Sequence, residues 1–267
     1  MKTPKVLVLR AAGINCDQET KFVFEKAGAS ADLVHINRLY KNRSMLSDYH
    51  IFVIPGGFSH GDDISAGKIL ANELRFNLGR EIDSFINDKK LMLGICNGFQ
   101  VLVKTGFLPG FPPEKGNANH QQLVTLISND SNRYEDRWVY LKLSSEKSEF
   151  IKGDSILYLP VAHGEGKFVP KDKSVLAKLK KFDQIVFKYV KPDGKPSAVF
   201  PFNPNGSVEG IAGICDHTGR ILGMMPHPER YSDAANHPRW TRDGLKKMPD
   251  GMRIFINAVN YAKENLL

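Results

Sequence analysis

The chain has 267 residues, a formal net charge of +8 and an apolar fraction of 42%, so it can bury a substantial core in one large domain or two small ones. No apolar run is long enough to span a membrane, and the N-terminal segment leads into a strand rather than a signal peptide, so we expect a cytoplasmic protein. Its basic residues are dispersed without a nucleic-acid motif, so we expect neither nucleic acid nor a membrane as a partner.

Strands alternate with helices in the first part of the chain. Short apolar runs predict strands at 5–9, 31–36, 49–54 and 91–95, and helices are expected at about 15–27, 64–78, 81–87 and 97–105. Asn15 or Asp17 would cap the first helix, and Asp62 or Asp63 the second. This alternation predicts an α/β fold with a doubly wound, mostly parallel sheet and flanking helices.

The pattern changes beyond residue 109. A loop rich in Gly, Pro and Asn is expected at 110–120, followed by strands at 123–128, 138–143, 156–160 and 184–190, a hairpin of 211–216 with 221–225, and helices at 174–181 and 251–263. The first two of these strands are joined by a polar link that suits antiparallel pairing, so we expect a small antiparallel β portion. Without a clear linker, we expect a single domain over 1–267 that contains insertions.

The segment around Cys96 has the layout of a nucleophile elbow, in which a nucleophile stands on a tight turn between a strand and a helix. An apolar run ends at Cys96, and Gly94 and Gly98 flank it at the spacing that lets strand and helix approach closely. The amide of Asn97 would then face a developing oxyanion, and the helix N-terminus would favour a thiolate. The alternative is a buried structural cysteine beside turn glycines.

Two other cysteines are weaker candidates for the reactive thiol. Cys16 lies at a helix start after a strand but lacks a glycine elbow, and Cys215 lies within a strand and is expected to serve packing. The three cysteines are widely spaced, which argues against a disulfide framework or a zinc site.

A thiolate that attacks a carbonyl needs a base, an orienting group and oxyanion donors. His227 and Glu229 follow a strand and are two residues apart, so they project to the same side of an extended segment. His163 and His60 are the competing histidines, and the Pro-His-Pro-Glu run could also be simple turn chemistry. Gly57, in a Gly-Gly turn after the third strand, offers a second backbone amide for the oxyanion.

Together these segments resemble the triad (class I) glutamine amidotransferases, which carry a Gly-x-Cys-x-Gly elbow, a Pro-Gly-Gly loop and a late His-x-Glu in this order. Five longer stretches resemble the glutaminase subunits of phosphoribosylformylglycinamidine synthases: 12–17, 56–63, 94–100, 163–167 and 226–230. The resemblance extends from the first strand to the last helix. It implies a flavodoxin-like fold. The chain is longer than the compact members of that family, so the resemblance places insertions near 110–137 and 203–244.

The resemblance also implies a division of labour between subunits. L-Glutamine would be hydrolysed through a Cys96 thioester, with Glu229 orienting His227, and Gln100, His163, Gly164 and Glu165 would help to hold the substrate. The ammonia would pass to a synthetase subunit that amidates formylglycinamide ribonucleotide in de novo purine synthesis. ATP and magnesium are expected on that partner, and no cofactor or metal in this chain; many members also have a small bridging subunit.

Two other functional classes remain open from the sequence. A cysteine peptidase or a deglycase can place a thiol on a similar elbow, and a degenerate amidotransferase can act as a scaffold. The intact Cys, His and Glu set argues against the scaffold.

Overall fold

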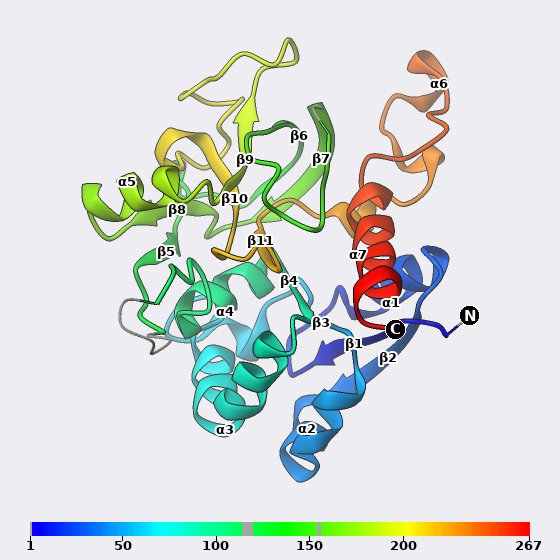
Figure 1. Ribbon diagram of the computed structural model, residues 1–267. Coiled ribbons are helices and arrows are strands. Elements are labelled where there is room, and N and C mark those ends of the chain that lie inside the picture. The colour runs from blue at the N-terminus through cyan, green and yellow to red at the C-terminus, as the bar shows by residue number, and fades with distance from the viewer. Residues whose placement is uncertain (1, 114–119, 154–155) are drawn as a thin grey trace.

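The computed structural model describes residues 2–113, 120–153 and 156–267 (Figure 1). Within these ranges the main sheet has nine strands, in the spatial order β2 (Ser30–His35), β1 (Lys5–Arg10), β3 (Ile51–Ile54), β4 (Leu91–Ile95), β11 (Ile221–Met224), β10 (Ile211–Cys215), β9 (Ile185–Val190), β6 (Glu135–Leu143) and β7 (Ile156–His163). Strands β2, β1, β3, β4 and β11 are parallel, and the remaining pairings are antiparallel. A separate two-stranded antiparallel sheet joins β5 (Val124–Ile127) to β8 (Lys167–Pro170). The expected mostly parallel sheet with an antiparallel portion is confirmed.

Helices cover both faces of the parallel strands. In Figure 1, α1 (Asp17–Lys26) and α7 (Met252–Asn265) lie on one side, and α3 (Lys68–Asn87) and α4 (Asn97–Thr105) on the other. Strands β3 and β4 are buried at every residue, as expected for strands covered on both faces, and this explains their uniformly apolar sequences. The shorter helices are α2 (Ile36–Lys41), α5 (Lys173–Lys181) and α6 (Trp240–Asp243). None of the helices in the described ranges is long and apolar enough to cross a membrane.

The parallel strands bring distant parts of the chain to one edge of the sheet. Strands β1, β3, β4 and β11 all end there, because each runs parallel to its neighbour. Cys16 follows β1, Gly57 follows β3, Cys96 follows β4 and His227 follows β11. The carboxyl edge of a parallel sheet is where ligands bind in such folds.

One helix replaces the two that we expected between residues 64 and 87. Its buried stripe continues through Leu78, Ile82 and Phe85, so Gly79 does not interrupt it. The expected capping by Asp62 or Asp63 is also wrong, since Asp62 and Ile64 have positive φ angles and α3 begins only after Gly67. At α1 the N-cap residue is Cys16, and neither Asn15 nor Asp17 caps the helix through its side chain.

The expected antiparallel pairing of strands 123–128 and 138–143 is wrong. Strand β5 pairs with β8, a short strand that the sequence pattern did not indicate, and β6 pairs with β7 and β9. Part of the loop expected at 110–120, residues 114–119, lies outside the described residues. The insertions near 110–137 and 203–244 remain predictions; within the second, α6 projects away from the sheet (Figure 1).

Candidate active site

Cys96 occupies a strained turn between β4 and α4. Its backbone angles are φ 50° and ψ −104°, a region that residues other than glycine rarely adopt. Its amide donates to the Met224 carbonyl of β11 at 2.8 Å, and its carbonyl accepts from Gln100 N at 3.1 Å, so both flanking elements hold the turn. The thiol is 4% exposed and lies 3.6 Å from the Ala162 carbonyl oxygen. The segment therefore has the geometry of a nucleophile elbow.

The two glycines around Cys96 permit this close approach. A Cβ at Gly98 would lie 1.8 Å from the Ile54 carbonyl oxygen at the end of β3, and a Cβ at Gly94 would lie 2.6 Å from the Gly98 carbonyl oxygen. No side chain fits at either position without movement of the backbone. The expected reason for the Gly-x-Cys-x-Gly spacing is confirmed.

His227 and Glu229 form a buried hydrogen-bonded pair. His227 Nδ1 lies 2.5 Å from Glu229 Oε1, and each residue is 2% exposed. The His227 backbone amide donates to the Pro160 carbonyl at 2.8 Å, which ties this segment to β7. The Nε2 atom of His227 and the Oε2 atom of Glu229 have no hydrogen-bond partner among the described residues. The carboxylate thus orients the imidazole through its Nδ1 atom, as in a catalytic triad.

The surroundings of His227 favour its protonated form. Burial alone would lower the pKa of the imidazole, but the Glu229 carboxylate and the Cys96 sulfur raise it well above its ordinary value. An imidazolium beside the Cys96 sulfur stabilises a thiolate. The pair can therefore accept and hold the thiol proton.

The competing histidines are engaged elsewhere. Both ring nitrogens of His163 face asparagine side chains, with Nδ1 3.1 Å from Asn129 Oδ1 and Nε2 3.5 Å from Asn205 Nδ2. Burial lowers the pKa of His163 to about 3, so this imidazole is neutral. His60 Nε2 lies 3.0 Å from Glu73 Oε2. The ring of His163 is therefore held by amides, and the ring of His60 by Glu73 rather than Glu229.

A family model for the CobB/CobQ-like glutamine amidotransferase domain matches residues 3–262. The phosphoribosylformylglycinamidine synthase subunit PurQ of Dehalococcoides mccartyi is 46% identical over 265 residues, which cover 99% of this chain and 100% of that protein. The subunit PurQ of Methanococcus maripaludis is 43% identical, with 97% of each chain covered. The chain belongs to this family of glutamine amidotransferases.

Solved structures agree with the family at the level of the fold. A chain in the structure of PurLQS from Thermotoga maritima matches with a TM-score of 0.72 and 28% identity, covering 97% of this chain and 99% of that one. Another glutamine amidotransferase from Thermotoga maritima matches with a TM-score of 0.53 over 99% and 94% of the two chains, and at 19% identity it shows the fold alone.

Gln100, which this amidotransferase carries one turn after Cys96, joins the elbow to the loop after β7. Its Nε2 donates to the Glu165 carbonyl oxygen at 2.6 Å, and its Oε1 accepts from Asn97 Nδ2 at 2.9 Å. The Gly164 carbonyl accepts from the Asn129 amide at 2.9 Å, and Asn129 also binds the His163 carbonyl. The residues expected to hold glutamine are thus brought together in one polar network beside Cys96.

The two expected oxyanion donors follow neighbouring strands. Gly57 follows β3 and has a φ angle of 144°. It packs against the backbone of residues 13–15, and a Cβ on Gly57 would lie 2.7 Å from the Gly13 carbonyl oxygen. Asn97 is 1% exposed, and its side chain is fixed by Ser59 N at 3.2 Å and Asp62 Oδ1 at 3.0 Å. Their roles as oxyanion donors remain predictions.

Sequence reasoning missed one buried charged residue near this network, Lys104, and gave the half-buried Asp62 only a capping role. Lys104 is 6% exposed and donates to the Ala66 carbonyl, and burial lowers the pKa of its amine although Glu165 and Asp62 raise it. Burial raises the pKa of the Asp62 carboxyl. A signal for Lys104 was present, because it is four residues from Gln100 on the same helix and therefore shares its face.

Proposed function

We propose that this amidotransferase hydrolyses L-glutamine to glutamate and ammonia through a Cys96 thioester, and that it supplies the ammonia to a synthetase subunit that converts formylglycinamide ribonucleotide to formylglycinamidine ribonucleotide. The observation that carries the proposal is the strained Cys96 elbow on the same sheet edge as the buried His227–Glu229 pair. Membership of the family supports the substrate and the pathway.

The chemistry follows from these positions. The Cys96 sulfur attacks the side-chain amide carbon of glutamine, and His227 takes the thiol proton while Glu229 fixes the imidazole. The backbone amides of Gly57 and Asn97 stabilise the oxyanion. His227 then protonates the leaving nitrogen, so ammonia departs and a thioester remains. Water, deprotonated by His227, attacks the thioester and releases glutamate and the Cys96 thiol.

The polar network around Gln100 supports the expected substrate pocket. The network includes four residues expected to hold glutamine: Gln100, His163, Gly164 and Glu165. His163 is neutral, so it adds no charge to the pocket. In this proposal the network shapes the pocket and fixes the loop after β7. When glutamine binds, Gln100 replaces one of its internal hydrogen bonds with a hydrogen bond to the substrate.

A partner subunit completes the proposal. The relatives are named as subunits of a synthase, and the Thermotoga maritima structure is of a PurLQS assembly. We propose that ATP and magnesium act on the synthetase partner, that the assembly works in the cytoplasm, and that a small bridging subunit can join it. The low exposure of Cys96 and His227, 4% and 2%, favours a site that the partner opens or completes.

The test is glutamate release from L-glutamine by wild type and Cys96→Ala, with and without the cognate synthetase, formylglycinamide ribonucleotide, ATP and magnesium. We expect release that requires Cys96 and rises when the partner and its substrates are present. Release that persists in Cys96→Ala would overturn the nucleophile. Cleavage of peptides without a partner would indicate a peptidase, and partner binding without glutamate release would indicate a scaffold.

A further inference from the structure

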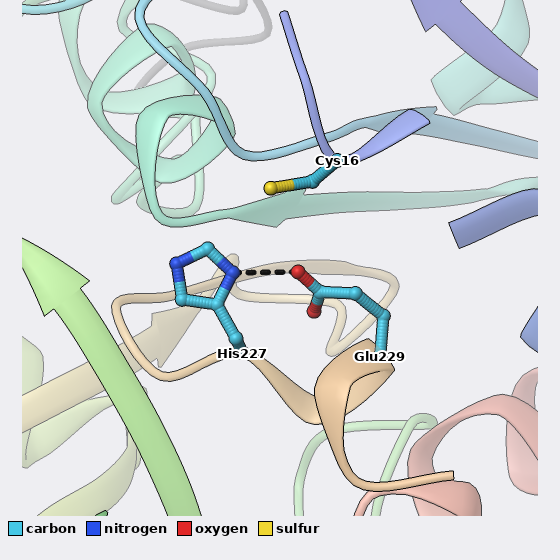
Figure 2. A group of neighbouring side chains, drawn as sticks. All are labelled: Cys16, His227 and Glu229. Carbon is cyan, nitrogen blue, oxygen red and sulfur yellow. Dashed lines mark hydrogen bonds and ion pairs between the residues drawn. The ribbon is translucent and has the colours of Figure 1, made fainter. Parts of the chain in front are cut away.

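The mechanism uses Cys96 but leaves a second buried thiol beside the same histidine. Cys16 ends the turn after β1 and is 1% exposed. Its sulfur, one ring nitrogen of His227 and one carboxylate oxygen of Glu229 all lie within 4.8 Å of one another. Figure 2 shows the Cys16 side chain pointing toward the hydrogen-bonded His227–Glu229 pair from the opposite side of the site.

Gly56 makes this approach possible. A Cβ at this position would lie 2.7 Å from His227 Cε1 and 3.1 Å from Cys16 Sγ, so any larger residue would push the two side chains apart. The absence of a side chain at Gly56 therefore keeps the thiol and the imidazole next to each other.

Ordinary hydrogen bonding accounts for only part of the cluster. The Cys16 thiol lies 3.2 Å from Asn15 Oδ1, and Arg230 Nη2 donates to its sulfur at 3.2 Å. However, Glu229 Oε2 is buried without a partner among the described residues, and the mechanism does not use this atom. Buried polar atoms in this state normally have a partner, which a bound water, substrate or ion can provide.

We propose that Cys16, His227 and Glu229 form a site for a thiophilic divalent cation, with Zn²⁺ as the best fit, and that its occupation blocks glutamine hydrolysis. This assigns a metal site to a chain for which the sequence predicted none. One sulfur, one nitrogen and one oxygen ligand match the donor types that Zn²⁺ takes, and a water can fill the fourth position of a tetrahedral shell. Magnesium and calcium prefer sets of oxygen ligands, so the cluster selects against them.

Protons and charges balance in this binding step. A bond forms between the metal and the Cys16 sulfur as the S–H bond breaks, and the thiol proton leaves to water. Any proton on the ligating nitrogen of His227 also leaves, or moves to the other ring nitrogen. The Cys16 thiolate and the Glu229 carboxylate together neutralise the two charges of the cation.

The inhibitory half of the proposal rests on the proposed function, whereas the binding half does not. When the His227 imidazole ligates the metal, it can no longer act as a base for Cys96. When the Glu229 carboxylate turns to ligate the metal, it no longer orients the imidazole. Cys96 is a competing ligand, so the experiments must distinguish the two thiols.

Binding is tested with Co²⁺, which reports thiolate ligation by a charge-transfer absorption. The protein is the full chain with Cys96→Ala and Cys215→Ala, in which Cys16 is the remaining cysteine. We expect a charge-transfer band that disappears when Cys16→Ser is added. We also expect His227→Ala in the same background to weaken Co²⁺ binding by roughly 100-fold or more. Loss of a residue that only supports a metal ligand already costs about 10-fold to 100-fold in affinity.

No band in the protein that retains Cys16, or unchanged affinity after His227→Ala, would overturn the site. Circular dichroism of each variant confirms folding, and Cys16→Ala replaces Cys16→Ser if the serine variant does not fold. Cobalt absorption needs no turnover, so this arm remains interpretable even if the chain proves to have no glutaminase activity.

Inhibition is tested with Zn²⁺ on glutamate release by the assembled complex. We expect the half-inhibiting Zn²⁺ concentration to rise by roughly tenfold or more in Cys16→Ser relative to wild type, and chelation to restore wild-type activity. Cys215→Ala is the matched control, because burial raises the pKa of this thiol to about 12 in a remote strand. Equal sensitivity of wild type and Cys16→Ser would assign the inhibition to Cys96 and overturn this half of the proposal.

Discussion

His227 Nδ1 lies 2.5 Å from Glu229 Oε1, in a site where both residues are 2% exposed. The Pro residue between them starts a short 3₁₀ turn that brings the carboxylate back to the ring. Burial strengthens this contact, because a low local dielectric increases the interaction between opposite charges. Replacement of the Glu229 carboxylate by an amide therefore tests this contact directly.

Glu229→Gln should lower the rate of glutamine hydrolysis while leaving the fold intact. The amide cannot hold the imidazolium and favours the wrong tautomer, so we expect a loss in kcat on the order of 10³–10⁴-fold. Steady-state glutamate release by the complex measures it. His60→Gln is the control, since the ring of His60 pairs with Glu73 rather than Glu229; an equal loss in that variant would contradict the assignment.

The same variant should change the pH dependence of stability. The pKa of His227 is raised in the folded protein, so its stabilising effect is fully present below pH 6.5, its unfolded value, and is lost as the pH rises through the folded value. Glu229→Gln removes a cause of that rise. We expect the loss in free energy of unfolding to be larger at pH 6 than at pH 10 in denaturant titrations, and a larger loss at pH 10 would contradict this.

The backbone strain at Cys96 predicts a difference between two inactive variants. Glycine adopts positive φ readily, whereas alanine keeps the steric cost of φ 50° and ψ −104°. We expect Cys96→Gly to be more stable to unfolding than Cys96→Ala by about 1 kcal/mol. Denaturant titrations of both proteins give the difference, and a more stable alanine variant would show that the turn is relaxed.

Gly98→Ala should destabilise the elbow strongly. The new methyl group would lie 1.8 Å from the Ile54 carbonyl oxygen, so the strand or the helix must move. We expect a loss of about 3 kcal/mol, at the upper end of overpacking effects, together with most of the activity. Gly79→Ala is the matched control: nothing lies within 4 Å of its Cβ, and in the interior of α3 it should stabilise by about 0.5–1 kcal/mol.

Asn129 holds the loop that we expect to contact glutamine. Its side chain binds the carbonyls of Arg133 and His163 at 2.8 Å and accepts from the Gly166 amide at 3.0 Å. Asn129→Ala should raise KM for glutamine and destabilise the protein by about 2 kcal/mol, because buried partners are left unsatisfied. Asn265→Ala, at the exposed end of α7, should change neither. An unchanged KM in Asn129→Ala would separate this loop from substrate binding.

Local sequence was sufficient for the parallel half of the sheet and for the elbow. Short, wholly apolar runs that alternate with helices permit few arrangements, and Gly94 and Gly98 around Cys96 limit the turn to one that lets strand and helix touch. Sequence was less informative for β5 and β8, because a pair of four-residue strands far apart in the chain leaves almost no periodic signal. The start of α3 was also missed, because Asp62 and Ile64 adopt positive φ angles, which these residue types rarely do.

The sequence by itself predicted Cys96 as the reactive cysteine and His227 with Glu229 as its partners, because these predictions depend on residue type and short spacing. Only the tertiary structure decided that the ends of β1, β3, β4 and β11 meet at one edge, and therefore that Cys16 and Cys96 both approach His227. It also showed that the ring of His163 lies between the side chains of Asn129 and Asn205. The two cysteines lie more than 100 residues from His227 in the chain. They meet it because of the order of the strands in the sheet, and no local sequence pattern encodes that order.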